Sequence, residues 1–138
     1  MTRRHVVVPY PASNSTVRTR ALHWIDRLTA GGLIEPGEVV VHGPGFAGGR
    51  VPPDEPVHLV RNARRVTRGR HEARLLRRAA PGVYDLDDGL PWDDGTLASL
   101  GRWWKRPFPR SLLARRAAAA ADRLIVGNEV LAGWAADH

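Results

Sequence analysis

The alternation of short apolar runs with segments of helical composition constrains the fold of this chain more than any other sequence feature. Short, largely apolar runs lie at residues 5–8, 38–42, 57–60, 82–86 and 124–126, and all except 57–60 are followed directly by Pro, Gly or Asp. Segments of helical composition lie at residues 17–28, 68–80, 111–122 and 129–137. Strands joined by helical crossovers form parallel sheets with right-handed connections. We therefore predict an α/β fold, a Rossmann-like doubly wound parallel sheet of about five strands, in one domain spanning residues 1–138.

Length and composition fit that prediction. The chain has 138 residues, 43% of them hydrophobic and 25% charged, which is typical of a globular domain with a single core. No apolar run approaches the roughly 20 residues that cross a bilayer. The chain has no cysteine, so disulfides, thiolate zinc sites and cysteine nucleophiles are excluded. We expect a cytoplasmic protein, with the inner face of the membrane as a second location.

The charge balance is strongly basic. The net charge is +7, and all but one of the 21 basic residues are Arg. Such a charge suits nucleic acid, anionic lipid or phosphorylated substrates without choosing among them. Arg70, Arg74, Arg77 and Arg78 share one side of the predicted helix, and we interpret them as a solvated face.

A glycine-rich stretch, GPGFAG at residues 43–48, matches the G-x-G-x-x-G pattern of dinucleotide sites. That fingerprint follows the first strand and opens a helix, whereas this stretch follows the second strand and precedes Pro52 and Pro53. We predict a flexible loop and no bound cofactor. The six His residues lack H-E-x-x-H spacing, and we predict no metal site.

An acidic turn, DLDDG at residues 85–89, ends the predicted fourth strand. Ligands of open α/β sheets bind outside the carboxyl ends of the strands. Three carboxylates in four positions would repel one another and raise at least one pKa, which suits a general base or cation binding. The alternative is a turn whose Asp side chains cap its own backbone N–H groups. The sequence leaves both interpretations open.

The loop after the first strand offers a second group of candidates, because a helix N-terminus favours anions. These residues are Ser13, Asn14, Ser15, Thr16, Arg18 and Arg20. Arg18 and Arg20 lie two apart, so they point to different sides of a helix and do not both face one phosphate. The alternative interpretation is helix capping with solvated Arg side chains.

A third segment, RWWKRPFPR at residues 102–110, mixes cations with aromatic side chains. We expect at least one of Trp103 and Trp104 to cover the sheet. The second interpretation is that these two Trp residues and Arg106 contact an anionic membrane. Stacking on single-stranded nucleic acid ranks last.

Three segments in this order resemble the N-terminal domains of GT-B glycosyltransferases of the large family four, particularly actinobacterial ones. They are HVVVPYP at residues 5–11, GVYDLDDGLPW at residues 82–92, and ADRLIVGNEVLAGWA at residues 121–135. The last is similar to the family pattern in which an A-D-x-(apolar)3-G-N strand leads into a short helix.

The resemblance implies a Rossmann-like domain that binds the acceptor and forms one wall of a cleft. The nucleotide-sugar donor would be held mainly by a C-terminal domain, through an E-x7-E motif that this sequence lacks. Transfer would retain anomeric configuration and would need no bound metal.

Site residues follow from the same resemblance. Asp87 falls where many relatives carry a cleft His, which implies a base or a contact to the acceptor hydroxyl, with Asp88 beside it. Asn128 and Glu129 follow the last strand and would face the cleft. The residues from Ser13 to Thr16 occupy the place of a Gly-Gly loop near the donor phosphates, and this sequence lacks that Gly pair.

Two functions are therefore compared. In the first, the chain is the acceptor-side half of a glycosyltransferase, inactive without a donor domain in the same or a separate chain. In the second, it is a non-catalytic basic module that binds anionic membrane or nucleic acid. The acidic turn and the Gly-Asn strand end favour the first. The sugar, the nucleotide and the acceptor do not follow from the sequence.

Overall fold

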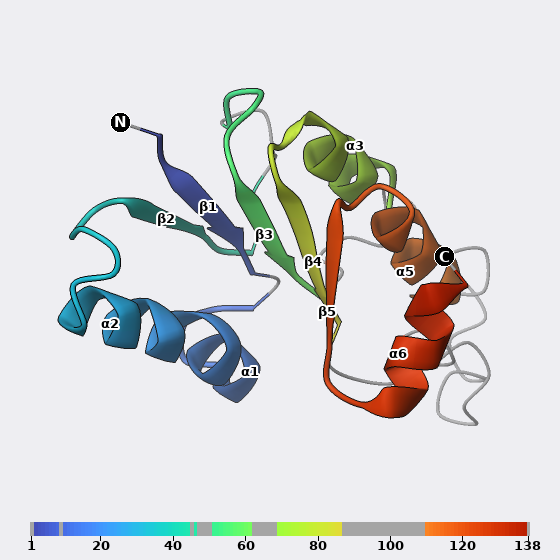
Figure 1. The fold of residues 1–138 in the computed structure, drawn as a ribbon, viewed down its shortest axis with the longest axis horizontal. Helices are drawn as coiled ribbons and strands as arrows, with labels where there is room; N and C mark the ends of the chain where they lie inside the picture. Colours follow the sequence, from blue (N-terminus) through green and yellow to red (C-terminus); the bar gives the residue numbers. More distant parts are fainter. Residues whose placement is uncertain are drawn as a thin grey trace.

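The computed structural model describes residues 2–8, 10–44, 46, 51–61, 69–86 and 110–137, and every structural statement below concerns these residues. They form a five-stranded, all-parallel sheet in the order β2-β1-β3-β4-β5 (Figure 1). The strands are β1 (Arg4–Val7), β2 (Val39–His42), β3 (Val57–Val60), β4 (Gly82–Leu86) and β5 (Arg123–Val126). This sheet confirms the predicted doubly wound α/β fold.

Helices cover the two faces of the sheet unequally (Figure 1). On one face, α1 (Ser15–Val17), the π-helical turn η1 (Arg18–Leu22) and α2 (His23–Ala30) run on as one helix. On the other face lie α3 (Arg70–Arg78), α5 (Arg110–Ala118) and α6 (Glu129–Ala136). The first helix crosses from β1 to β2, and the others follow β3, β4 and β5. Their opposite sides follow from right-handed crossovers in the two directions away from β1.

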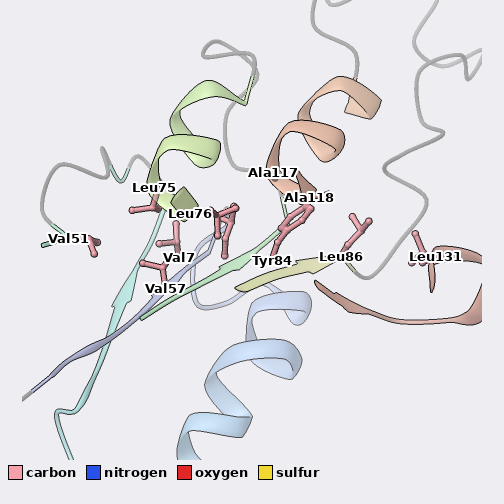
Figure 2. Packing of buried hydrophobic residues seen from close by; sticks show 11 residues of the cluster. Val7, Val51, Val57, Leu75, Leu76, Tyr84, Leu86, Ala117, Ala118 and Leu131 are labelled. Carbon is pink, nitrogen blue, oxygen red and sulfur yellow. The ribbon is translucent and has the colours of Figure 1, made fainter. Parts of the chain in front are cut away.

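The larger core lies between the sheet and the second group of helices (Figure 2). Alternate strand residues point to this face, and Leu59, Tyr84 and Leu86 are fully buried there. They pack against Leu76 of α3 and Leu131 of α6. Burying each large apolar side chain stabilises the fold by about 1.5–3 kcal/mol, so this face carries most of the hydrophobic stabilisation.

The smaller core lies beneath the first helix. Val17 and Ala21, four residues apart on that helix, are buried against Val6, Val8 and Val60. The helix begins after Asn14, one of the residues predicted for capping, and ends before Gly31 and Gly32, of which Gly32 has a φ of +68°.

Several details of the predicted packing differ in the structure. In the predicted helical segment 17–28, apolar residues recur at helical spacing, which places Trp24 and Leu28 on the side expected to be buried, yet they are 54% and 37% exposed. The strand β2 was expected to be buried and is half-buried, because it lies at the edge of the sheet. The predicted helical segment 68–80 extends beyond the end of α3 at Arg78, and Ala80 is exposed. The predicted solvated face of that helix is confirmed, since all four of its Arg residues are exposed.

Close approach of α3 to β4 requires a glycine at position 82. A Cβ added to Gly82 would lie 2.5 Å from the carbonyl oxygen of Leu76, a backbone atom that moves only with its helix. We therefore expect Gly82→Ala to lower the free energy of unfolding by about 1–3 kcal/mol in urea denaturation, as overpacking does. The matched control is Gly133→Ala in α6, where an added Cβ meets nothing within 4 Å. That change should stabilise the protein by about 0.5–1 kcal/mol, because Ala favours a helix more than Gly does. Equal stability of Gly82→Ala and the wild type would contradict this packing.

Candidate functional site

The order of the strands places a topological switch point between β1 and β3. The chain moves from β1 outward to β2, and then returns past β1 to form β3 on the other side. In open parallel sheets, the connections after the two strands at such a point diverge and leave a crevice at their carboxyl ends. Ligands bind there in doubly wound folds, so this edge is the first place to look for a site.

A buried carboxylate lies near this edge. Asp85, the penultimate residue of β4, is 4% exposed and lies on the face of the sheet that carries the first helix. Its Oδ1 atom accepts hydrogen bonds from Arg20, 3.1 Å from Nε and 2.5 Å from Nη2. Its Oδ2 atom lies 3.3 Å from Nε2 of His58, on the neighbouring strand β3. Each carboxylate oxygen therefore has a partner, one from the helix and one from the sheet.

The partners of Asp85 determine its charge. Burial raises the pKa of this carboxyl group, but the hydrogen bonds from His58 and Arg20 and their positive charges outweigh burial. The net result is a lowered pKa, so Asp85 is ionised at neutral pH and is a poor general base. We expected at least one carboxyl group of the acidic turn to have a raised pKa, and Asp85 is not that group. Asp87 and Asp88 lie outside the described residues, and their predicted role stays a prediction.

A cation lies at the switch point itself. Arg61 follows β3 directly, and its guanidinium carbon lies 5.6 Å from the ring centroid of Tyr10, which follows β1. The backbone N–H of Arg61 donates to the carbonyl oxygen of Asp85 over 2.9 Å. Arg61 has a φ of +57°, an uncommon conformation for a side chain of this size. Arg61 thus links the ends of three strands, because its guanidinium group contacts Tyr10 after β1 and its backbone N–H bonds to Asp85 of β4.

The structure separates the residues predicted for the loop after β1. Asn14 is the N-cap of the first helix, and its Oδ1 atom accepts from the backbone N–H of Thr16 at 3.0 Å. Ser13 and Ser15 are exposed. The prediction that the two Arg side chains diverge is confirmed, because Arg18 is exposed while Arg20 reaches Asp85.

The predicted residues after β5 lie at the far end of the same edge. Asn128 is the N-cap of α6, and its Oδ1 atom accepts from the backbone N–H of Leu131 at 2.9 Å. Asn128 and Glu129 are both exposed. Since β5 is three strand positions from β1, they are displaced from the loop after β1 by about 14 Å across the sheet. Trp103, Trp104 and Arg106, predicted for membrane or acceptor contact, lie outside the described residues.

A second polar cluster lies on the opposite face of the sheet and was not predicted. His5 is 5% exposed, with Nε2 2.5 Å from a carboxylate oxygen of Glu55 and Nδ1 2.8 Å from Nε2 of His42. A carboxylate only accepts, so His5 donates from Nε2 and, when neutral, accepts from His42 through Nδ1. The ring of His42 also stacks on Phe46, with centroids 4.0 Å apart. This cluster fastens both ends of the connection from β2 to β3 against β1.

A cavity of about 610 Å³ extends from the buried ion pair along the face of the sheet, beside α2. Its lining is mainly apolar and includes Trp24, Leu28, Val83 and Ile125, with Arg20 and Asp85 among its polar groups. Over the described ranges, no three His, Asp or Glu side chains are grouped to hold a metal ion. No helix among the described elements is long and apolar enough to cross a membrane.

The chain matches no protein-family model, no curated protein and no solved structure. The likeness to GT-B glycosyltransferases therefore rests on the three sequence segments alone. The structure shows that those segments contain β1, β4 and β5.

The lowered pKa of Asp85 links stability to pH. An ionised carboxylate with a depressed pKa stabilises the fold above its unfolded pKa of about 3.9. This contribution is lost as the pH falls through the folded pKa.

At neutral pH we expect Asp85→Asn to lower the free energy of unfolding by about 1–3 kcal/mol, because Arg20 is left without its anion. The gap between wild type and variant should narrow below pH about 4 in acid–urea titrations. Asp26→Asn, at an exposed position of α2, is the control. A gap that persists unchanged at pH about 2 would contradict this account.

Proposed function

We propose that this chain is the acceptor-binding domain of a glycosyltransferase that uses a nucleotide-sugar donor and acts together with a donor-binding domain. One observation carries the proposal. Each of the three segments that resemble the GT-B family contains one strand, namely β1, β4 or β5. Because the sheet is all parallel, the three strands end at the same edge, and the loop that follows each strand begins there. That edge is where doubly wound folds bind ligands.

Charge at the switch point supports a phosphorylated donor. A nucleotide sugar carries two phosphate groups, and Arg61 places a guanidinium at the end of β3. The capped start of the first helix follows β1 at the same edge, and its backbone N–H groups add to the positive potential. Arg20 is compensated by Asp85 and acts as a positioning residue that fixes the first helix against β4.

The reaction assigns one role to the acidic turn after β4. An acceptor hydroxyl oxygen forms a bond to the anomeric carbon, while the bond from that carbon to the diphosphate breaks. The hydroxyl proton leaves to a base or to the departing phosphate. The hydrogen bonds from His58 and Arg20 lower the pKa of Asp85, so this carboxylate is ionised and unsuited to that task. We assign Asp87 to contact or deprotonate the acceptor hydroxyl, with Asp88 beside it.

The test is sugar transfer by the native assembly. The protein would be captured by antibody from its source cells with any bound donor domain, and assayed with radiolabelled nucleotide sugars. Wild-type assemblies should transfer sugar to an acceptor fraction from the same cells. A chromosomal Asp87→Asn change should reduce kcat by about 100-fold or more, as loss of a general base does. The isolated 138-residue chain should transfer nothing.

The control is Asp137→Asn, which removes an exposed carboxylate at the end of α6 and should leave kcat unchanged. Full turnover by the isolated chain would contradict the requirement for a donor domain. If the captured wild-type assembly transferred no sugar from any nucleotide sugar, the glycosyltransferase proposal itself would be wrong.

A further inference from the structure

A hydrogen bond between two histidine side chains joins the edge strand β2 to its neighbour β1. The strand β2 pairs with β1 alone in the described sheet (Figure 1). Nδ1 of His5 on β1 lies 2.8 Å from Nε2 of His42 at the end of β2, and the two ring planes differ by 13°. The backbone amide of Val8 also donates to the carbonyl oxygen of His42, over 2.9 Å. A side-chain bond thus supplements the backbone ladder at this edge.

The bond between the two rings contains one proton. A carboxylate oxygen of Glu55 lies 2.5 Å from Nε2 of His5 and only accepts, so this nitrogen carries a hydrogen. When both rings are neutral, Nδ1 of His5 is bare and accepts from Nε2 of His42. The cluster can bind one added proton without losing a bond, because His5 then donates from both of its nitrogens, to Glu55 and to His42.

A second added proton breaks the bond between the rings. Both nitrogens across the 2.8 Å gap would then carry a hydrogen, and both rings would carry a positive charge. Glu55 is in contact with His5 and offsets the charge of that ring. His42 is better placed to separate, because it is half-buried whereas His5 is 5% exposed. Phe46, whose ring centroid lies 4.0 Å from that of His42, presents an aromatic face that attracts a cation.

Other charged groups do not hold these two rings together. Among the described residues, the side chain of His5 forms hydrogen bonds and ion pairs only with Glu55 and His42. The titratable and charged groups on the adjoining segments are Arg4 and Glu38, which pair with each other, Asp54, Arg77 and Arg78, which are exposed, and His58 and Asp85, which pair on the opposite face of the sheet. The protonation of His5 and His42 therefore decides whether they stay bonded.

We propose that His5 and His42 form a pH-sensitive junction, which fastens β2 to β1 while at most one added proton is bound and opens when both rings are protonated. Histidine gains its charge between about pH 8 and 5. In mild acid the two rings bind two added protons in the open state, whereas the closed junction binds one. The open state therefore gains population as the pH falls, by about tenfold per pH unit for a difference of one proton. This inference does not depend on the proposed sugar transfer.

The pH range separates this junction from the buried ion pair. The pKa of Asp85 is lowered, so this group stays ionised down to a pH of about 4. Protonation of His58 adds an attraction to the ionised Asp85 and does not favour opening. An opening that begins at a pH of about 6 is thus the expected behaviour of His5 and His42.

The test is amide hydrogen exchange of the whole ¹⁵N-labelled chain from about pH 7 to about pH 4.5, corrected for the exchange rate of an unstructured peptide at each pH. The corrected rate of Val8, whose amide bonds to His42, should rise about tenfold per pH unit below about pH 6. The amide of Val57 donates to Pro81 over 3.0 Å in the interior of the sheet. It should exchange more slowly than Val8, because only β2 opens.

Substitutions identify the titrating pair. His42→Gln keeps a side chain that both donates and accepts but binds no proton, and it should abolish the rise in acid. Glu55→Gln removes the anion that offsets the charge of His5, so the rise should begin at a higher pH. His23→Gln, at an exposed position of α2, is the matched control and should behave as the wild type does. Circular dichroism checks that each variant is folded.

Four results would overturn the proposal. The first is a corrected exchange rate of Val8 that does not change with pH, and the second is the same rise in His42→Gln as in the wild type. The third is a set of ring ¹⁵N spectra in which His5 and His42 are both doubly protonated while Val8 stays as protected as at neutral pH. The fourth is an equal rate for Val8 and Val57 at every pH, since the chain would then unfold as a whole.

Discussion

The ion pair between Arg20 and Asp85 holds the first helix to the centre of the sheet. Asp85 is buried on β4, and burial alone would favour its neutral form. Arg20 from η1 and His58 from β3 reverse that preference and keep it ionised. A change that removed either the anion or the cation would leave the other charge partly buried without its partner, which costs more than the pair contributes. The helix therefore has one polar anchor in addition to its small apolar core.

The remaining structure is asymmetric around this anchor. On one face, three helices and the strands enclose the larger core, with Tyr84 and Leu76 fully buried. On the other face, a single helix covers β1 and part of β3, and no other helix in the described ranges lies there. The carboxyl edge of the sheet and the mainly apolar cavity beside α2 meet at Asp85.

The fold was largely predictable from local patterns, whereas the candidate site was only partly so. Short, mainly apolar runs between polar or turn-forming residues are typical of strands, and the bounds of β3 and β4 agree with the prediction. Helical periodicity showed that Arg18 and Arg20 diverge. It did not show that Trp24 is exposed, because periodicity gives the direction of a side chain but not the width of the sheet beneath it. The contact between Arg20 and Asp85 joins residues 65 positions apart, and no local pattern encodes it.

In the proposed function, the ligands of this domain bind at the carboxyl edge between β1 and β3, as they do in other doubly wound folds. The most direct measurement is a titration of the ¹⁵N-labelled chain with nucleoside diphosphate sugars, followed by backbone amide chemical shifts. We expect the largest chemical-shift changes at the backbone amides of Tyr10, Thr16 and Arg61. Two results would contradict binding at this edge. One is a set of shift changes centred on the amides on either side of Pro56, at the opposite edge of the sheet, and the other is no shift change at millimolar ligand.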